Sequence, residues 1–453
     1  MNEILQTINR VVWGIPTLFL ILITGIYLSW KTRFFQITHF GHSFRSFLSK
    51  LKPGGKPPDG VSPYQALCTA LAATVGTGNI AGVAGAISLG GPGAIFWMWL
   101  CALLGMILKC AEAVLAVHYR HKNSQGEIVG GPMFMIEKGL GPRWKLLAFG
   151  YAFFGVVAAF GVGNATQINA VIGGIHSASQ VFGLELSRTE DIIIAVFLAA
   201  LIALMFSGGA KRIGRIAEML VPYASLAYIF LGLGVLLVCR HRIPDALAAI
   251  LVGAFSPRAV TGGMIGSFLI VCRTGAARGI FTNEAGMGTA SIAHAAARVK
   301  HPVEQGMMGI MEVFLDTIVI CTVTALVILC SGVPISYGVD SGAELTFAAF
   351  SQVYGGWVRV LIALCLILFA LATVVGWGYY GLRCAQYLLG QNIFGFFIVM
   401  QVVTVILGAI LKTGTVWLLA ETVNGLMVIP NLIALLGLSP QFIKLILKYK
   451  KAT

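Results

Sequence analysis

Two polar, glycine-rich stretches interrupt segments that are otherwise apolar enough to lie in a membrane. The first reads ALAATVGTGNIAG at residues 70–82, and the second reads RTGAARGIFTNEAGMGTASIAHAAA at residues 273–297. In lipid, each backbone N–H or C=O group without a partner costs several kcal/mol, so a helix opens only where something satisfies the freed groups. We therefore predict that each stretch is the unwound centre of a broken helix whose freed backbone binds a ligand.

The order of donors and acceptors around Gly76 and Gly78 predicts which ligands the first stretch binds. The N–H groups that begin the following half-helix suit a carboxylate, because they lie at the positive end of its dipole. The carbonyls that end the preceding half-helix suit a small cation. A glycine face for close helix packing is the alternative, but Thr74, Thr77 and Asn79 add polar side chains that favour the binding interpretation.

A glutamate occupies the centre of the second stretch. Glu284 follows Asn283, and Arg278 lies six residues before it. A charged side chain at the centre of a membrane costs about 2.5–3.5 kcal/mol on insertion scales, so Glu284 should be paired or functional. Pairing with an arginine and direct contact with a ligand are both open. Phe281 and Thr282 can add an apolar wall and polar backbone to a small site.

Two further pairs of charged residues lie at helical spacing inside apolar segments. Glu312 and Asp316 are four residues apart, which puts both on one face of a helix. Such a pair can share a proton or bind a cation, but we expect both to be gate counter-ions to Arg273, Arg278 or cations in the loops. Lys109 and Glu112, three residues apart, are predicted to form a local salt bridge.

Amide and aromatic side chains form two more helical patterns. Asn164 and Gln167 are three residues apart, so we predict that they share one face of one span. Thr373, Trp377 and Tyr380 follow the i, i+4, i+7 pattern of a single stripe. Ordinary core packing explains the aromatic pair well, whereas Gln167 is harder to explain that way because a buried amide needs partners.

The elements that position these residues are predicted to be membrane helices. Of 453 residues, 58% are hydrophobic and 11% charged, with a mean hydropathy of +0.88, whereas soluble domains carry about 25% charged residues. A span needs about 20 apolar residues. We predict an all-α integral membrane protein with eleven spans, at about residues 11–30, 63–90, 93–118, 144–175, 191–206, 216–239, 261–297, 307–331, 358–387, 394–411 and 416–438. The tail 441–450, with Lys444 and Lys448 beside apolar residues, is predicted to be a helix at the membrane surface.

The lysines and arginines predict the orientation in the membrane. Most of the 31 fall in alternate loops and in the tail, and cytoplasmic loops carry the excess of positive charge. We therefore expect the N-terminus outside and the C-terminus in the cytoplasm, across the plasma membrane or, in a Gram-negative cell, the inner membrane. The net charge of +14 is thus a topology signal and not a nucleic-acid surface.

The two broken segments begin two halves of five predicted spans each. Because five is an odd number, the second half must be inverted relative to the first. Paired broken helices at corresponding positions of inverted halves are typical of a transporter's binding site. We accordingly divide the chain into an N-terminal helix with a basic loop (1–60), two halves (61–240 and 241–438) and a basic tail (439–453).

Four strings of residues resemble one known family over nearly the whole chain. They are TVGTGNIAG, NEAGMGTASIAHAAA, EVFLDT and TVVGWGYYG, and they resemble the alanine or glycine:cation symporter family. That family is similar in fold to the sodium-coupled leucine transporters, with two inverted five-helix repeats, here preceded by one extra helix. The resemblance implies uptake of alanine, glycine or serine coupled to Na⁺, or to H⁺.

The resemblance also implies roles for individual residues. The implied substrate contacts are Thr77, Gly78 and Asn79 for the carboxylate, Phe281, Thr282 and Asn283 at the partner break, and Gln167 and Trp377 in the pocket, with Trp377 limiting side-chain size. The implied Na⁺ ligands are carbonyls near Ala72 and Val75 and groups near Ala372 and Thr373. The chain departs from the family at Ala372, where a second threonine is usual, and at Leu382, where a glutamate is common.

A secondary active symporter is therefore the function that the sequence predicts. Its partners are a small neutral amino acid, Na⁺ and membrane lipid, with no nucleic acid. The sequence has no ATP-binding loop, so an ion gradient or facilitated diffusion must drive transport. An intramembrane enzyme is disfavoured, because HExxH, GxSxG and suitably paired aspartates are missing from the sequence. A proton-coupled symporter and an ion channel are the remaining alternatives.

Overall fold

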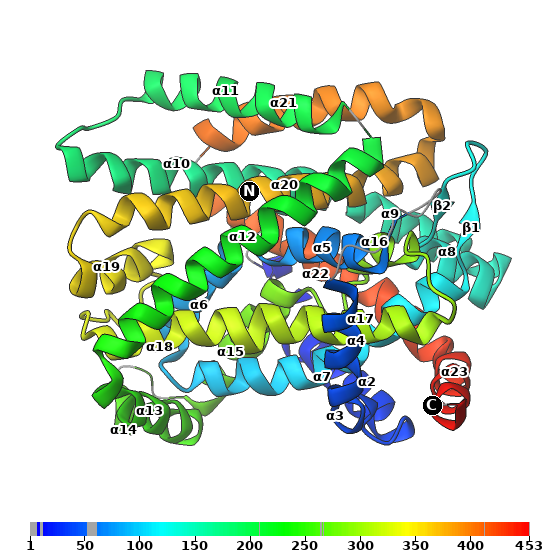
Figure 1. The fold of residues 1–453 in the computed structure, drawn as a ribbon, viewed down its shortest axis with the longest axis horizontal. Helices are drawn as coiled ribbons and strands as arrows, with labels where there is room; N and C mark the ends of the chain where they lie inside the picture. The colour runs from blue at the N-terminus through cyan, green and yellow to red at the C-terminus, as the bar shows by residue number, and fades with distance from the viewer. Residues whose placement is uncertain are drawn as a thin grey trace.

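The fold is almost entirely helical (Figure 1). The computed structural model describes residues 7–9, 12–51, 61–207, 209–262, 265, 267–411 and 413–452. The end of the predicted basic loop, residues 52–60, and Lys412 lie outside this described part. One short hairpin is present, in which β1 (His121–Lys122) pairs antiparallel with β2 (Ile128–Val129).

The helices follow the apolar segments of the sequence. In the first part of the chain they are α2 (Ile15–Lys31), α3 (Phe35–Thr38), α4 (Phe40–Leu51), α5 (Pro63–Thr74), η1 (Thr77–Asn79), α6 (Ala81–Gly90), α7 (Ala94–His118), α8 (Pro132–Met135), η2 (Ile136–Leu140), η3 (Pro142–Trp144), α9 (Lys145–Phe160), η4 (Gly161–Ala165), α10 (Thr166–Ser179), η5 (Gln180–Phe182), α11 (Arg188–Phe206) and α12 (Gly209–Val238). In the second part they are η6 (Arg240–Arg242), α13 (Ile243–Phe255), α14 (Pro257–Thr261), α15 (Phe268–Asn283), α16 (Thr289–Ala295), α17 (Pro302–Val313), η7 (Phe314–Cys321), α18 (Thr322–Ser331), α19 (Gly342–Tyr354), α20 (Val358–Leu389), η8 (Gln391–Ile393), α21 (Phe394–Ile410), α22 (Thr413–Gly437) and α23 (Ser439–Ala452).

The prediction of a multispan helical membrane protein is confirmed. Among the described residues, seven helices are long and apolar enough to cross a membrane, or nine if each of two bent pairs counts as one span. A helix lies within each of the eleven predicted segments, although α2 and the α15–α16 pair fall short of that test. The count of eleven, the inverted halves and the orientation stay predictions.

The first broken helix opens where the glycines and threonines predict. Ser62 caps α5 through a reciprocal capping box with Gln65, and Pro63 occupies its first turn, where a missing N–H costs nothing. The helix ends at Thr74, Gly76 is extended, and the chain resumes as η1 and then α6. The axes on either side of the break differ by 59°.

The second broken helix opens at Glu284. Helix α15 ends at Asn283, and α16 begins at Thr289. Between them Glu284 has φ 55°, Gly286 has φ 90° and Gly288 has φ 79°. Glycine tolerates this left-handed region without steric cost, whereas a glutamate there is uncommon and indicates a constrained position. The predicted second break is thus confirmed.

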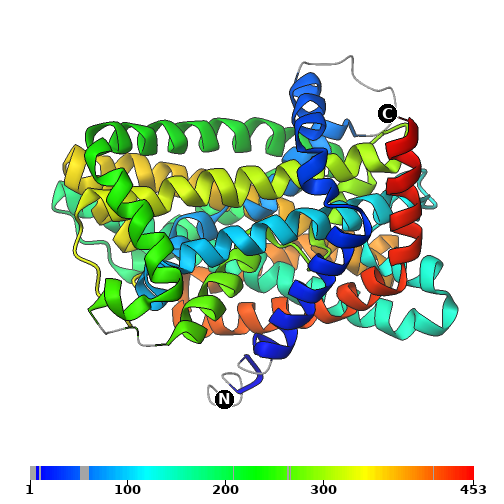
Figure 2. The same cartoon turned by 90° about the horizontal axis from the view of Figure 1, so that it is seen from below.

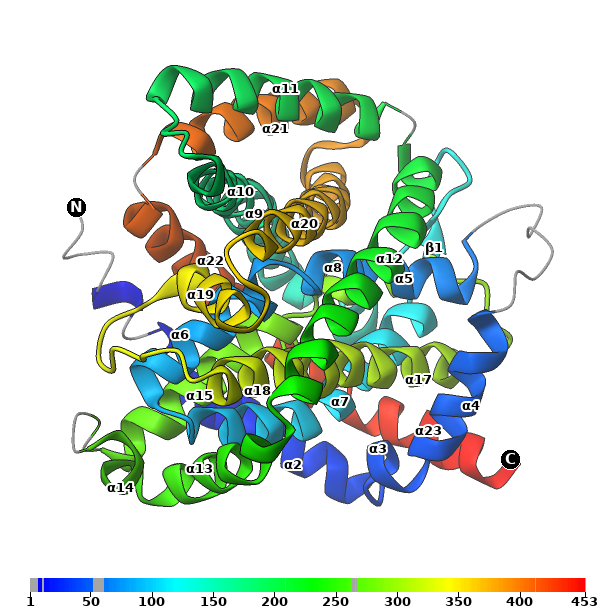
Figure 3. The ribbon, with the colours of Figure 1, turned by 60° about the vertical axis from the view of Figure 1, so that its left-hand side comes forward.

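The long helices lie side by side in layers, and the two breaks are inside (Figures 1 and 3). Helices α11 and α21 cover one outer face, and α10, α12 and α20 form the next layer. Helix α5 packs against α12 and α20 on one side and against α16 and α17 on the other, while α7 contacts α15 and α17. Figure 2 shows α4 lying across the long helices near the end of the molecule that carries α23.

Three π-helical turns and six additional α-helices among the described residues were not expected from the sequence. The fourth predicted span runs from α9 to α10 through the π turn η4, the eighth runs from α17 to α18 through the π turn η7, and η2 is the third π turn. The additional helices lie in segments predicted as loops and are α3, α4, α8, α13, α14 and α19. Such π turns often occur at functional sites.

Gly93, which precedes α7, is packed so closely that a single methyl group cannot fit. A Cβ at Gly93 would lie 2.1 Å from the carbonyl carbon of Gly253 in α13. We expect Gly93→Ala to destabilise the protein by about 1–3 kcal/mol, because backbone must move. The measurement is the thermal unfolding midpoint in detergent. Gly173→Ala is the matched control, since nothing lies within 4 Å of a Cβ there. An unchanged midpoint for Gly93→Ala would contradict the packing of α7 on α13.

Candidate functional site

The two breaks touch each other in the interior of the protein. A Cβ at Gly78, in the first break, would lie 3.3 Å from Thr282 Oγ1 at the end of α15. Thr282 keeps this hydroxyl in place by donating to the carbonyl of Arg278. Thr77, Asn79 and Thr282 are buried. The structure therefore brings together the two segments that the sequence predicted to form one site.

The first break leaves three hydrogen-bond donors unused. Among the hydrogen bonds of the described residues, none uses the backbone N–H groups of Thr77 or Gly78. The hydroxyl of Thr77 is also buried without a partner. Since buried polar groups are nearly always hydrogen-bonded, three unpaired donors on adjacent residues point to a ligand that accepts hydrogen bonds.

Asn79 stabilises the opening with its side chain. Its Oδ1 accepts from the N–H of Gly76 at 2.9 Å, and its Nδ2 donates to Asp316 Oδ1 at 2.7 Å. Its own backbone N–H donates to the carbonyl of Gly76 at 3.3 Å. The side chain of Asn79 is therefore engaged by the protein, and Thr77 and Gly78 keep the free donors.

Helix α20 lies against the start of the first break. A Cβ at Gly76 would lie 2.6 Å from Thr373 Oγ1 and 3.5 Å from Gln167 Oε1. Thr373 donates its hydroxyl hydrogen to the carbonyl of Phe369 at 3.0 Å, which leaves the oxygen as an acceptor. Gln167 Oε1 is buried without a partner. Two acceptor oxygens thus flank Gly76.

The predicted cation residues lie at this contact. Ala72, Val75, Ala372 and Thr373 are all buried. A Cβ at Gly376 would lie 2.8 Å from the backbone nitrogen of Ala73, so α20 and the end of α5 are in close contact. This contact places the four residues in adjoining turns of the two helices.

Asn164 and Gln167 face different neighbours, so the prediction of a shared face is wrong. Asn164 Nδ2 donates to both the carbonyl and the Oε1 of Gln401 in α21. Gln167 Nε2 donates to the carbonyl of Val162 at 3.1 Å, while its Oε1 faces Gly76. The π turn η4 holds Asn164 and ends just before this part of the helix, and its wider turn shifts the phase of the residues after it.

Glu112 accepts hydrogen bonds from the backbone N–H groups of the second break. Its Oε1 accepts from the N–H groups of Gly286 at 2.9 Å and Gly288 at 3.1 Å, and from Asn431 Nδ2 at 2.8 Å. The predicted Lys109–Glu112 salt bridge is therefore wrong: Lys109 Nζ lies 3.2 Å from Glu312 Oε1 instead. The donors that a carboxylate would seek at the second break are already occupied by the protein.

Glu284 is held by neutral donors and not by an arginine. Trp377 Nε1 donates to its Oε1 at 2.7 Å, and Thr289 Oγ1 donates to its Oε2 at 2.5 Å. The alternative in which Glu284 pairs with an arginine is wrong, because Arg278 lies 3.1 Å from Asp340 and 3.4 Å from Glu421. Trp377 thereby ties α20 to the second break.

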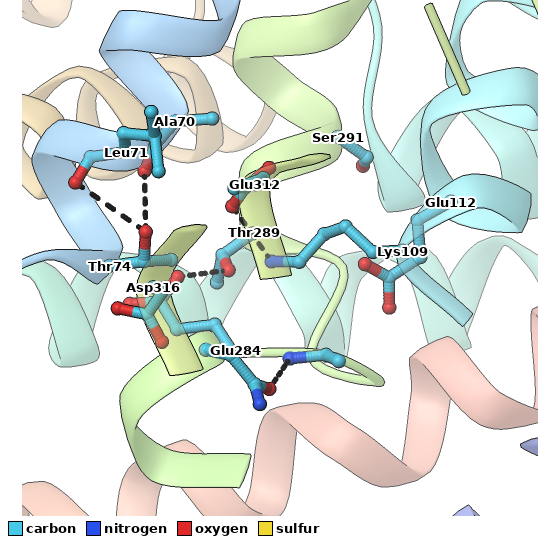
Figure 4. Close-up of polar contacts among 12 residues, drawn as sticks. Ala70, Leu71, Thr74, Lys109, Glu112, Glu284, Thr289, Ser291, Glu312 and Asp316 are labelled. Carbon is cyan, nitrogen blue, oxygen red and sulfur yellow. Dashed lines mark hydrogen bonds and ion pairs between the residues drawn. The ribbon is translucent and has the colours of Figure 1, made fainter. Parts of the chain in front are cut away.

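Glu312 and Asp316 do not serve as counter-ions to arginines, so that prediction is also wrong. Glu312 lies beside Lys109 (Figure 4) and 2.8 Å from His294 Nε2. Asp316 accepts from Asn79 and, at 2.8 Å, from Thr317 Oγ1. Asp316, in η7, supports the first break through Asn79, and the sequence analysis, which named Asp316, did not predict this contact. The signal for such a role was an aspartate in the middle of an apolar span.

Phe281 lines a cavity, and the side chain of Asn283 is engaged by the protein. Phe281 lines a cavity of about 220 Å³ together with Trp13, Arg278 and Glu421. Asn283 uses Nδ2 to donate to Thr317 Oγ1 and Oδ1 to accept from the N–H of Ala285. Of the predicted site residues outside the first break, Gln167 and Thr373 lie beside Gly76, and Thr282 lies beside Gly78.

Comparisons with known proteins agree with this geometry. A model of the sodium:alanine symporter family matches residues 1–453. The chain is 42% identical to the sodium/alanine symporter AgcS of Methanococcus maripaludis, over 96% of this chain and 94% of that protein. It is also 42% identical to an uncharacterized transporter of Haemophilus influenzae, over 97% and 94% of the two chains.

A solved structure shows the same fold. The complex of MhsT with L-phenylalanine matches with a TM-score of 0.59 over 86% of this chain and 99% of the other, at 14% identity. The fold is thus that of the leucine-transporter-like proteins. The relatives are transporters, so the protein is not an enzyme. The chain belongs to the sodium:alanine symporter family.

Proposed function

We propose that the protein is a secondary active symporter that carries a small neutral amino acid, such as alanine, glycine or serine, into the cell together with Na⁺. The observation that carries this proposal is the set of three unused donors at Thr77 and Gly78, buried in the interior of the protein. They lie at the start of a short helical segment, where a carboxylate is stabilised. Family membership supports a cation-coupled amino-acid transporter.

The substrate carboxylate accepts from the N–H groups of Thr77 and Gly78 and from the hydroxyl of Thr77. Glu112 favours this placement, because it already occupies the corresponding donors of the second break. Gln167 and Thr282 border the opening, and Trp377 closes the side that faces Glu284. Asn79 is a positioning residue that holds the break open.

The coupling cation binds at the end of α5. Carbonyl oxygens of Ala72 and Val75 and the hydroxyl oxygen of Thr373 form a set of oxygen donors, which a hard cation such as Na⁺ prefers. Ala372 contributes no hydroxyl. One cation that enters through 100 mV releases about 2.3 kcal/mol, enough for roughly 50-fold accumulation of a neutral solute at about 1.4 kcal/mol per factor of ten.

An ion-pair network is suited to control access from the predicted outer side. Arg278 of α15 lies 3.1 Å from Asp340, which precedes α19, and 3.4 Å from Glu421 of α22. These three residues come from separate elements beside the 220 Å³ cavity that Phe281 lines. In alternating access, their separation would let α15, α22 and the segment before α19 move apart on that side.

Uptake of radiolabelled alanine into proteoliposomes tests the proposed function. We expect saturable accumulation with an inward Na⁺ gradient, and loss of accumulation when that gradient is collapsed at constant pH. Accumulation that follows the H⁺ gradient alone would support the proton-coupled alternative. Uptake that survives the collapse of both gradients would contradict coupling, and unitary currents without saturable flux would indicate a channel.

Gly76→Ala should abolish transport while Gly82→Ala preserves it. A Cβ at Gly76 would lie 2.6 Å from Thr373 Oγ1, the proposed cation ligand, whereas a Cβ at Gly82 would meet its nearest atom at 3.6 Å. We expect at least about a tenfold loss of Na⁺-driven uptake for Gly76→Ala, since displacing a group by 1 Å in a preorganised site costs that much or more. Equal uptake by both variants would exclude Thr373 and Gly76 from the site.

Trp377→Leu should widen the range of transported amino acids. The indole is fully buried and donates to Glu284, so its removal opens space beside the second break. Competition of alanine uptake by valine and leucine is the measurement. Thr289→Val is the matched control, because it removes the other donor to Glu284 with little change in volume. Unchanged selectivity in Trp377→Leu, or the same widening in Thr289→Val, would remove Trp377 as the size-limiting residue.

A further inference from the structure

A groove on the outer surface of the helix bundle is lined by η7, the same element that contacts the first break. It has a volume of about 550 Å³ and is formed by α3, α4, α7, η7 and α18. Its walls are mainly apolar, with Ile37, Leu103, Met106, Phe314 and Ile318 among them. Ile37 and Leu103 are 56% and 40% exposed, so the groove opens away from the protein core.

The polar groups that border the groove are mostly engaged by the protein. Trp99 Nε1 donates to Thr322 Oγ1 at 2.8 Å, which fixes the indole as one wall. Gln36 Nε2 donates to Ser29 Oγ at 2.7 Å. An apolar molecule that enters the groove therefore displaces little water from polar groups. A groove of this kind between membrane helices suits an acyl chain.

The elements at one end of the groove are strongly basic. Residues 31–51, which include α3 and α4, contain Lys31, Arg33, Arg45 and Lys50 and no acidic residue. Helix α23 contains Lys444, Lys448, Lys450 and Lys451 and no acidic residue. The ends of these elements meet, because Lys450 Nζ donates to the carbonyl of Thr32 at 3.0 Å and lies 5.5 Å from the ring of Phe35. Figure 3 shows α3, α4 and α23 gathered on the same side of the molecule.

The cations in this region repel one another. Burial and the charge of Arg33 lower the pKa of Lys450. Burial, Lys450 and His42 lower the pKa of His39, whose ring stacks on Phe35. The acid paired with this surface among the described residues is Glu304, which lies 3.8 Å from Lys50. The charge of the surface is thus complementary to an anion.

Helix α4 is built to lie in the boundary between headgroups and acyl chains. Phe44, Leu48 and Leu51 are exposed along one face at i, i+4 and i+7, while Arg45 is exposed beside them. An amphipathic helix of this pattern lies in the plane of the membrane surface with its apolar face in lipid. Anionic lipids are attracted to basic segments in that position.

We propose that an anionic phospholipid binds here, with its phosphate over Lys31, Arg33 and the cations of α4 and α23 and an acyl chain in the groove against Trp99. The groove shares η7 with the first break: Phe314 and Ile318 face the lipid, while Asp316 on the same helix holds Asn79. The lipid therefore packs against the outer face of the π turn that supports the opening. This site does not depend on which amino acid or ion is transported.

Tryptophan quenching in nanodiscs tests the site. The full chain is placed in phosphatidylcholine containing a small, fixed fraction of lipid brominated on its acyl chains, with either a phosphatidylglycerol or a phosphatidylcholine headgroup. The difference between wild type and Trp99→Phe isolates Trp99 among the eight tryptophans. We expect Trp99 to be quenched at a brominated phosphatidylglycerol fraction about fivefold lower than for phosphatidylcholine, the preference that one cation near the surface gives. Trp357, which is 56% exposed and lies outside the basic surface, supplies the signal of ordinary surrounding lipid.

Charge variants separate the headgroup contact from the groove. Arg33→Gln combined with Lys450→Gln should remove the preference for phosphatidylglycerol and leave quenching by both lipids. Lys122→Gln, an exposed cation on β1, is the matched control and should keep the preference. Equal quenching of wild-type Trp99 by the two lipids would overturn the proposal. So would the absence of any Trp99 quenching, as expected if a second copy covered the groove, or a preference that survives the double variant.

Discussion

A backbone that opens inside a membrane must find a partner for each N–H and C=O group that it frees, and the structure depends on how two broken helices meet that demand. At the second break, the protein supplies the partners: Glu112 accepts from two glycine N–H groups, and Trp377 and Thr289 hold Glu284. At the first break, the side chain of Asn79 accepts from the N–H of Gly76 only, and the donors of Thr77 and Gly78 are unused. We infer that the second break has a structural role and that the first break binds the ligand.

The same demand explains the charged residues of the interior. Glu112, Glu284, Glu312 and Asp316 are buried, and among the described residues the cation paired with this group is Lys109. Lys109 compensates the charge of Glu312, which also lies 2.8 Å from His294 Nε2, whereas the other three carboxyl groups are held by neutral hydrogen-bond donors. Buried carboxylates in such settings are costly unless hydrogen bonds satisfy them. Of these three, Glu112 accepts from backbone N–H groups at the second break, whereas Glu284 and Asp316 accept from side chains beside the two breaks.

Local sequence was enough to predict the breaks, and it was not enough to predict their partners. A regular apolar helix is disfavoured by the glycines and threonines at 74–78 and by the NEAGMG string at 283–288. This effect does not depend on which helices surround them, so both openings were predictable. The partner of Lys109 is Glu312, about 200 residues away, and nothing in the spacing of Lys109 and Glu112 shows how α7 and α17 pack. The separation of Asn164 from Gln167 follows from the π turn η4, which a regular helical period cannot reveal. Resemblance to a family supplied Gln167 and Thr373, and the structure brings both to Gly76.

The central claim is that the first break, and not the second, holds the amino acid and its cation. A structure determined with alanine and Na⁺ bound tests it most directly. We expect the alanine carboxylate within hydrogen-bond distance of the N–H groups of Thr77 and Gly78, with Na⁺ among the oxygens of Ala72, Val75 and Thr373. A carboxylate bound at Gly286 and Gly288 with Glu112 displaced, or a cation far from Thr373, would contradict it.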